Sequence, residues 1–176
     1  LQIANLRCLT MIPIQDENPT RITPFINYLL IIANLAVFAY TLFNGTFADP
    51  NATCATEPNN TICVYGLKPA EVVAGSGYLT FLTSMFLHAG FLHIGGNMLY
   101  LWIFGNNVEE YLGHVRFALF YLLWGVLATW AHIAVNPSSN VPLIGASGAV
   151  AGILGAYILL HPRNQVLCLL FLFFFV

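Results

Sequence analysis

The sequence predicts an all-α, multi-pass membrane protein. Of its 176 residues, 59% are hydrophobic and 7% are charged, whereas soluble domains carry about 45–50% apolar and about 25% charged residues. The charged side chains are also bunched, which leaves four stretches without Asp, Glu, Lys or Arg: 22–48, 72–108, 117–162 and 164–176. Because a membrane-spanning helix needs about 20 apolar residues, we expect four full spans and the start of a fifth.

The first span is expected to run from Pro24 to Phe43. Proline is tolerated in the first turn of a helix, where its missing N–H would have no partner, and the Asn44-Gly45 pair favours a helix end. The composition then shifts to Asn, Thr, Pro and Gly, which predicts a long loop over 44–82. A connection of that length is usually functional or fixed on the surface, so this loop can cover a site.

The other apolar stretches predict the remaining helices. Polar residues interrupt the chain at 105–114, and Asn, Pro and Ser break it again at 136–142. A fifth helix would begin after Asn164, but it holds about 13 residues, too few to cross a membrane. In order, the helices expected after the first are 83–104, 115–135, 145–161 and the start of one at 165–176.

The positive charges predict the orientation, because Lys and Arg favour the cytoplasmic side of a membrane protein. With the N-terminus inside, four of the five lie on that side and one lies outside: Arg7, Arg21, Arg116 and Arg163 against Lys68. We therefore expect 1–23 to be a cytoplasmic segment and 24–176 to be an incomplete membrane domain, with the loop 44–82 outside.

Two cysteines, Cys54 and Cys63, share the loop that is expected outside. An external compartment is oxidising, so thiols there can pair. Eight residues separate the two, and loop-closure arithmetic gives such a bond at most about 2–3 kcal/mol of stabilisation. We predict a disulfide, with a Cα–Cα distance below about 7 Å.

Polar side chains within apolar stretches are costly and often mark function. The stretch expected to form the second helix holds His88, His93 and Asn97, and the fourth helix opens on Ser147. His93 and Asn97 are four residues apart, so they share a helix face. Ser147 would lie among the free N–H groups and the positive dipole end of its helix, where an anion is stabilised.

A purely structural interpretation of these residues stays open. A serine among glycines is often a packing residue, and the Gly148-xxx-Gly152-xxx-Ala156 spacing by itself predicts only close helix contact. A His and an Asn four residues apart can equally join two helices by a hydrogen bond. The histidines near helix ends or in loops are better explained as interfacial side chains: His114, His132 and His161.

Other chemistries lack the residues they need. No His-Glu-x-x-His motif occurs and no carboxylate lies within an apolar stretch, which excludes a zinc protease and ion transport by buried carboxylates. The two aspartates, Asp16 and Asp49, lie outside the expected spans, so aspartyl chemistry fails as well. The five Lys and Arg form no basic run, so nucleic acid is not an expected partner. No metal or cofactor is expected, which leaves serine chemistry.

Several segments taken together resemble the rhomboid intramembrane serine proteases, over about residues 11–176. Each segment alone is a weak signal, but their order along the chain is specific. They are Met11-Ile12-Pro13 through Asn18-Pro19, His88-Ala89-Gly90 through Asn97-Met98, Gly105 with Val108-Glu109 and Gly113, and Gly145-Ala146-Ser147-Gly148-Ala149-Val150-Ala151-Gly152.

The resemblance implies a six-helix core that lies in membrane lipid, opens its site to the external side and cleaves transmembrane segments of other membrane proteins without a cofactor. It implies that Ser147 is the nucleophile, and that His93 and Asn97 form the oxyanion hole with the Ser147 backbone N–H. His88 would support the site. The supporting glycines would be Gly145, Gly148 and Gly152, the last two by letting the fourth helix approach helix six closely.

Where the family often has Trp-Arg before helix two, alignment on His88 places Leu79-Thr80, and the family pattern is incomplete in a second respect. Its general base is a histidine on helix six, whereas this sequence stops in helix five, and neither His132 nor His161 stands at the matching position. A serine needs an adjacent base to become a good nucleophile. Two interpretations therefore stay open: a serine endopeptidase represented without its last helix, or an inactive form that binds transmembrane segments without cutting them. A channel or transporter would call for an internal repeat, which the sequence does not show.

Overall fold

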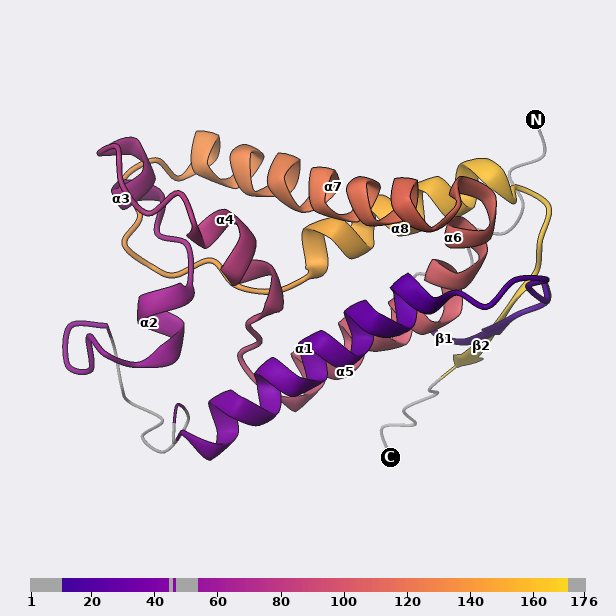
Figure 1. Ribbon diagram of the computed structural model, residues 1–176, viewed down its shortest axis with the longest axis horizontal. Coiled ribbons are helices and arrows are strands. Elements are labelled where there is room, and N and C mark those ends of the chain that lie inside the picture. Colours follow the sequence, from indigo (N-terminus) through magenta and orange to yellow (C-terminus); the bar gives the residue numbers. More distant parts are fainter. Residues whose placement is uncertain (1–10, 45, 47–53, 171–176) are drawn as a thin grey trace, which may run out of the picture.

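The computed structural model describes residues 11–44, 46 and 54–170, which form an elongated helical bundle with a two-stranded sheet at one end (Figure 1). We call the end that carries α2 and α3 the loop end, and the end that carries β1 and β2 the strand end. The elements are β1 (Met11–Asp16), α1 (Phe25–Phe43), α2 (Thr61–Tyr65), α3 (Pro69–Val73), α4 (Thr80–Thr83), the 3-10 turn η2 (Ser84–Phe86), α5 (Phe91–Tyr100), the π-helical turn η3 (Leu101–Gly105), α6 (Asn106–Leu112), α7 (His114–Val135), α8 (Ser147–Leu160) and β2 (Val166–Leu170).

The first, third and fourth predicted helices are confirmed as α1, α7 and α8. Among the residues that the structure describes, α1 and α7 are long and apolar enough to cross a membrane, and α8 is a shorter apolar helix. The protein is thus mostly helical, as predicted, while the count of four full spans is not confirmed.

The second predicted helix, 83–104, is wrong as a continuous element. The turn η2 ends at Phe86, Leu87 takes extended dihedral angles (φ −87°, ψ 144°), and α5 begins only at Phe91. His88 therefore lies in the connection before α5 and not on its face. The hydropathy pattern missed this break because the connection carries no charged residue and begins in the core, with Leu87 2% and His88 0% exposed, before Ala89 reaches the surface.

The π-helical turn η3 forms where α1 crosses the chain between α5 and α6. Nδ2 of Asn27, on α1, donates to the Leu101 carbonyl at 2.9 Å. A Cβ at Gly105 would overlap the amide of the same Asn27 side chain. A side chain inserted into the backbone ladder is an established cause of such irregular turns, so Asn27 and Gly105 together account for η3.

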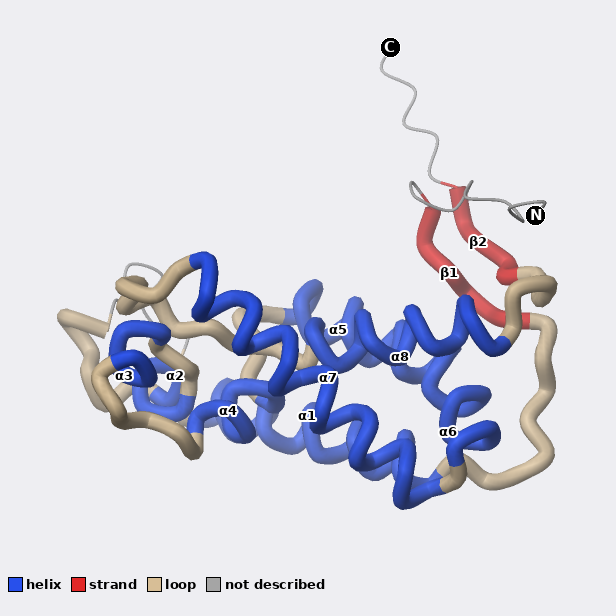
Figure 2. Tube along the Cα trace, turned by 90° about the horizontal axis from the view of Figure 1, so that it is seen from above, coloured by secondary structure: helices blue, strands red, loops and turns tan. Residues whose placement is uncertain are grey.

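The fifth helix expected after Asn164 is wrong for the residues described there. Val166–Leu170 instead form β2, which pairs antiparallel with β1, and the two strands project from the bundle (Figure 2). A short apolar run is compatible with a strand or a helix, and its pattern alone does not decide between them. Pairing with β1, near the other end of the chain, decides it here; residues 171–176 lie outside the described part.

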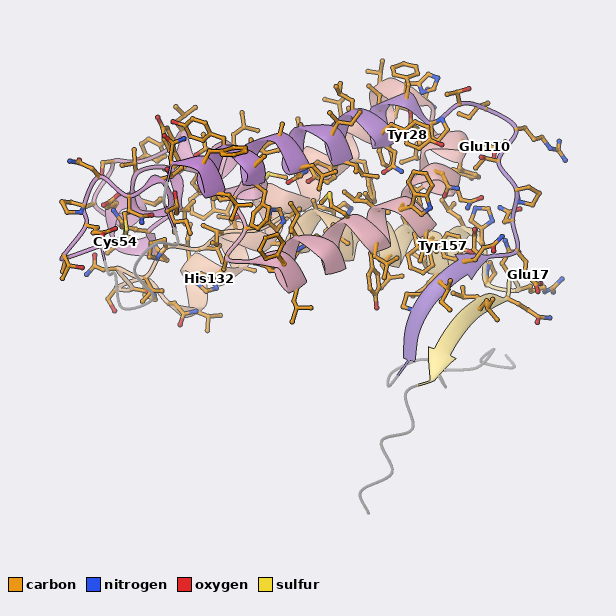
Figure 3. All side chains as sticks on the ribbon, turned by 90° about the horizontal axis from the view of Figure 1, so that it is seen from below. Glu17, Tyr28, Cys54, Glu110, His132 and Tyr157 are labelled. Carbon is orange, nitrogen blue, oxygen red and sulfur yellow. A yellow bond between two sulfur atoms is a disulfide. The ribbon has the colours of Figure 1, made fainter. Side chains whose placement is uncertain are left out.

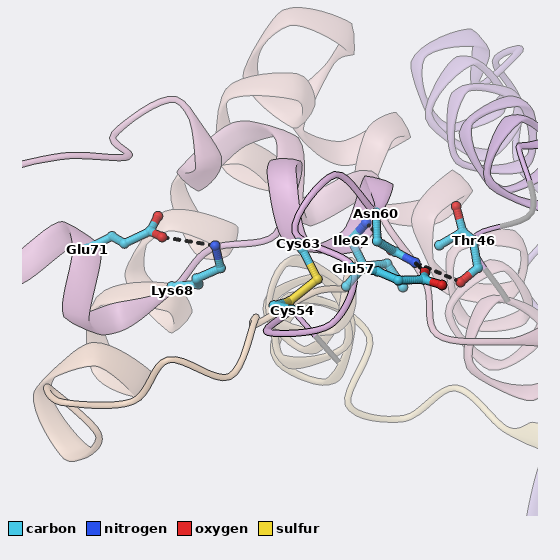
Figure 4. The surroundings of a disulfide bond; sticks show 8 residues. All are labelled: Thr46, Cys54, Glu57, Asn60, Ile62, Cys63, Lys68 and Glu71. Carbon is cyan, nitrogen blue, oxygen red and sulfur yellow. Dashed lines mark hydrogen bonds and ion pairs between the residues drawn. A yellow bond between two sulfur atoms is a disulfide. The ribbon is translucent and has the colours of Figure 1, made fainter. Parts of the chain in front are cut away.

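The range expected to be a loop, 44–82, contains α2, α3 and the start of α4. The predicted disulfide is confirmed within it: Cys54 and Cys63 are bonded, with their Cα atoms 5.4 Å apart (Figure 4). The Asn60 side chain caps α2 by accepting from the N–H of Ile62 at 3.0 Å. A cross-link and a cap therefore hold a helix of only five residues.

At the strand end, one buried carboxylate joins α1, α6 and α7. Glu109 is 0% exposed and accepts from the backbone N–H groups of Ile26 (3.0 Å) and Asn27 (2.7 Å). Its Oε1 also contacts Nδ1 of His114. Because α1 has no side-chain cap of its own, Glu109 satisfies two of its unpaired N–H groups and complements its dipole.

A second buried carboxylate, Asp16, ties β1 to the bundle. Its Oδ2 accepts from Asn107 Nδ2 and, at 3.2 Å, from the Tyr157 hydroxyl. Burial raises the pKa of Asp16 above its usual value. Figure 3 shows Tyr157 and Glu17 at this end of the molecule, with Cys54 and His132 at the other.

Candidate active site

Ser147 is the first residue of α8, and α8 begins well short of the end of its neighbour α7. A Cβ at Gly148 would overlap the Ala128 side chain, and a Cβ at Gly152 would overlap Trp124, both on α7. From Ala128, α7 continues for seven residues to Val135, which is about 10 Å at 1.5 Å per residue. Ser147 is therefore recessed from the loop end of α7 by about that distance.

Gly148 and Gly152 let α8 approach a neighbour closely, and among the described elements that neighbour is α7. A different row of α8, spaced by four residues, is exposed: Ser147, Ala151 and Gly155. Sequence spacing identified α8 as a close-packing helix, but it could not say which neighbour each row of small residues would meet.

Gly145 brings the His93 ring and the Ser147 hydroxyl to one place. A Cβ on Gly145 would lie 2.6 Å from His93 Nε2 and 3.8 Å from Ser147 Oγ. Its φ of +117° is also one that residues with a side chain rarely adopt. Glycine is thus required here both for the backbone conformation and for the approach of the imidazole.

The hydrogen bond to His93 Nδ1 determines where the neutral ring carries its proton. Nδ1 accepts from the N–H of Ala89 at 3.3 Å, so the proton is on Nε2, the nitrogen that faces Gly145. The buried His88 ring packs edge-on against the His93 ring, with their centroids 4.9 Å apart. His88 therefore supports the orientation of His93 from the connection before α5.

Asn97 lies one turn further along α5 and is buried. Its Nδ2 donates to the backbone carbonyl of His93 at 2.9 Å, so this amide is engaged within its own helix. Of the two side chains predicted to face Ser147, His93 is the one whose ring lies beside it.

The start of α8 supplies backbone donors as well. The N-cap residue, Ala146, has no side chain that could cap the helix, and its carbonyl accepts from the N–H of Val150 at 2.9 Å. The amides of the first turn have no acceptor within the helix. With Nε2–H of His93, they are donors that can stabilise a negative charge next to the Ser147 hydroxyl.

Two backbone contacts hold the segment that leads to Ser147, and the sequence indicated neither. The N–H of Gly145 donates to the Ser84 carbonyl at 2.9 Å, and Leu67 and Leu143 exchange N–H to carbonyl bonds of 3.0 and 2.7 Å. Every residue other than proline carries the same backbone donor and acceptor, so no side-chain signal could have identified these partners.

Within the described residues, no histidine is hydrogen-bonded to the Ser147 hydroxyl. His132 lies near the loop end of α7 (Figure 3). His161 follows the far end of α8, fourteen residues after Ser147, or about 20 Å along the helix. In the same part of the chain, no three His, Cys, Asp or Glu side chains converge as a metal site would require.

The site therefore has an exposed hydroxyl next to groups that can stabilise a negative charge. Comparison with known proteins shows that residues 75–176 match the Rhomboid domain. The chain belongs to the rhomboid family.

Three relatives illustrate the extent of the similarity. The chain is 31% identical over 175 residues to Rhomboid protease GluP of Bacillus subtilis (strain 168), an alignment that covers 94% of the chain and 32% of the relative. It is 26% identical over 166 residues to RHOMBOID-like protein 6, mitochondrial, of Arabidopsis thaliana, covering 81% and 53%. It is 35% identical over 85 residues to Rhomboid-type serine protease 2 of Emericella nidulans, covering 47% and 16%. The chain thus spans at most about half the length of these relatives.

Proposed function

We propose that the chain is the core of an intramembrane serine endopeptidase that cleaves transmembrane segments of other membrane proteins. The observation that carries the proposal is the exposed Ser147 beside Nε2 of His93, recessed from the end of α7. Two of the three relatives compared are named as proteases, one of them as serine-type. Those names support the reaction class for this chain.

In the proposed reaction, Ser147 Oγ attacks the carbonyl carbon of a substrate peptide bond. The carbonyl oxygen becomes an oxyanion, which accepts hydrogen bonds from Nε2–H of His93 and from the backbone N–H of Ser147. Asn97 becomes a further donor if its amide turns away from the His93 carbonyl. A base takes the Ser147 proton and returns it to the leaving amine.

In this proposal, the base comes from outside the described residues. The helix that carries it would dock on an exposed face of α8. The row Ser147, Ala151 and Gly155 is exposed and made of small side chains. Small residues in such a row let two helix backbones approach closely. A helix docked on this row would bring a histidine to the Ser147 hydroxyl.

The proposal includes a topology. The disulfide at the loop end supports placing that end in an oxidising compartment. Residues 1–23 are then cytoplasmic, and the site in the membrane domain 24–176 opens to the external side. We count the chain 80–112, although it is broken at 87–90, and the short α8, whose start is recessed, as spans together with α1 and α7.

The second candidate is an inactive member of the family that binds transmembrane segments without cutting them. The observation that favours it is that no base is hydrogen-bonded to Ser147 in the described part of the chain. The two functions differ in the reactivity of the serine, since a binding module has no need of an activated hydroxyl.

A serine-directed fluorophosphonate probe and a transmembrane substrate, both in detergent micelles, test the proposal. We expect a longer form, extended past Val176 to include the element that carries the base, to label at Ser147 and to cleave the substrate. The 176-residue chain by itself should do neither. Equal labelling and cleavage by both forms would place the base within residues 1–176, whereas a longer form that binds substrate but never labels would establish the binding function.

A further inference from the structure

The short helix α2 depends on contacts outside itself. Five residues are too few for a helix to be stable alone in water. The Cys54–Cys63 disulfide and the Asn60 cap hold α2, and Nδ2 of Asn60 also donates to the Thr46 carbonyl at 3.0 Å (Figure 4). Cys63 is 7% exposed, so the cross-link is made at the buried side of α2.

The end of α2 packs directly on the segment that leads to the nucleophile. A Cβ at Gly66, which follows α2, would lie 2.8 Å from Pro142 Cβ and 3.1 Å from Ile144 Cγ2. The next residue, Leu67, is 0% exposed and makes the two-way backbone bridge to Leu143. The loop end therefore holds residues 142–144 by backbone bonds and by close packing.

Those residues immediately precede the site. Gly145 is two positions after Leu143, and its N–H is held by the Ser84 carbonyl at 2.9 Å. Gly145 is also the residue that brings His93 Nε2 and Ser147 Oγ to one place. A shift of 142–144 would therefore move the backbone that sets the distance between the nucleophile and its oxyanion donor.

We propose that Leu67 is a positioning residue for Ser147, and that the Cys54–Cys63 disulfide acts through Leu67 to keep the approach segment 142–145 in place. The inference rests on the proposed protease site and extends it to the loop end. The cross-linked loop then positions the site as well as stabilising the fold. Opening the disulfide would make the segment 142–145 more mobile before the helical bundle unfolds.

Amide hydrogen exchange tests the physical part of the inference without any catalysis. The protein in micelles is compared oxidised, reduced with a phosphine, and as the double variant Cys54→Ser/Cys63→Ser. Loss of the cross-link should speed exchange at Leu67, Leu143 and Gly145 by about tenfold or more, while amides in the middle of α7, such as Tyr121, stay unchanged. Unchanged exchange at Leu143 and Gly145, or equal acceleration in α7, would overturn the inference.

Lys68→Ala serves as the matched control in the same loop. It removes the ion pair between Lys68 Nζ and Glu71 Oε1 (2.9 Å) but leaves the cross-link and the Leu67 bridge. We expect exchange at Leu143 and Gly145 to be unchanged in this variant. Acceleration there as large as in the double serine variant would show a general loosening of the loop and would contradict the specific path through Leu67.

Substrate cleavage by the longer form of the chain tests the catalytic part. Loss of the disulfide should lower kcat by between about tenfold and 10²-fold with KM little changed, and reoxidation of the reduced protein should restore it. Equal kcat in both redox states would overturn the inference while leaving the proposed protease intact. If the oxidised protein neither cleaves nor labels at Ser147, the protease proposal fails, and the exchange result alone then decides the coupling.

Discussion

The two ends of the bundle differ in whether their polar side chains have hydrogen-bond partners. At the strand end, the buried Asp16 side chain accepts two hydrogen bonds, and the buried Glu109 side chain accepts two from backbone N–H groups and also contacts the His114 ring. At the loop end, Ser147 is exposed and is not bonded to the His93 ring that lies beside it. Satisfied polar groups fix a fold, whereas donors left free can bind a charge that exists only in the transition state. The comparison separates the part that holds the bundle together from the part proposed to react.

The largest effect is expected at the loop end. In the complete enzyme, Ser147→Ala should lower the cleavage rate by about 10⁴-fold or more, because it removes the nucleophile. The thermal unfolding midpoint should hardly change, since the exposed hydroxyl has no hydrogen-bond partner among the described residues. Rates and midpoints measured on one preparation would check both statements.

A matched variant sharpens that prediction. Ala151→Ser places a hydroxyl on the same exposed row of α8, one turn further along. Combined with Ser147→Ala, it should not restore cleavage, because the position lacks His93 and Gly145 beside it. Recovery of activity in the double variant would contradict the assignment of Ser147.

The next largest effect is expected at the strand end, on stability. Glu109→Ala leaves the buried N–H groups of Ile26 and Asn27 and the His114 ring without their acceptor. Each buried donor left without an acceptor costs about 1–3 kcal/mol of unfolding free energy. Denaturant titration in mixed micelles would measure the loss.

The neighbouring Glu110 gives the control for that variant. It accepts one exposed hydrogen bond, from the N–H of Arg21 at 3.1 Å. Glu110→Ala should therefore cost less than about 1 kcal/mol. Similar losses from both variants would show that burial of the Glu109 carboxylate is not what stabilises the strand end.

A smaller effect is expected from the oxyanion donors. His93→Ala should lower kcat by about 10²–10³-fold, as the loss of one preorganised donor does in serine proteases. Asn97→Ala should cost less, because its amide is engaged with the His93 carbonyl. Steady-state cleavage by both variants would rank them, and a larger loss for Asn97 would reverse the roles assigned to the pair.

The smallest effect is a pH dependence at the strand end. Burial raises the pKa of Asp16 in the folded protein, so the folded state holds its proton more tightly than the unfolded chain does. Its contribution to stability is full below the unfolded pKa and is lost as the pH rises through the folded value. The unfolding free energy should therefore fall as the pH rises from about 4, and Asp16→Asn, which cannot ionise, should flatten that slope.

The sequence by itself determined the helical class, the helices α1, α7 and α8, and the candidate residues Ser147 and His93. These follow from properties that a residue carries with it: apolar side chains at membrane length, polar groups that are costly among them, and a breaker run before α8. The Cys54–Cys63 bond belongs to the same class, since it needed only two thiols in one expected compartment and a short separation.

The tertiary structure alone decided the rest. The break at 87–90 carries no charged residue and so does not interrupt the apolar stretch in the sequence, and β2 is a strand because β1 pairs with it. Gly148 and Gly152 pack against α7, and Leu67 holds Leu143 through backbone groups that every residue except proline carries. Each of these features depends on which segment packs against the residues concerned. The packing of the whole chain determines that partner, and the residues of one segment do not.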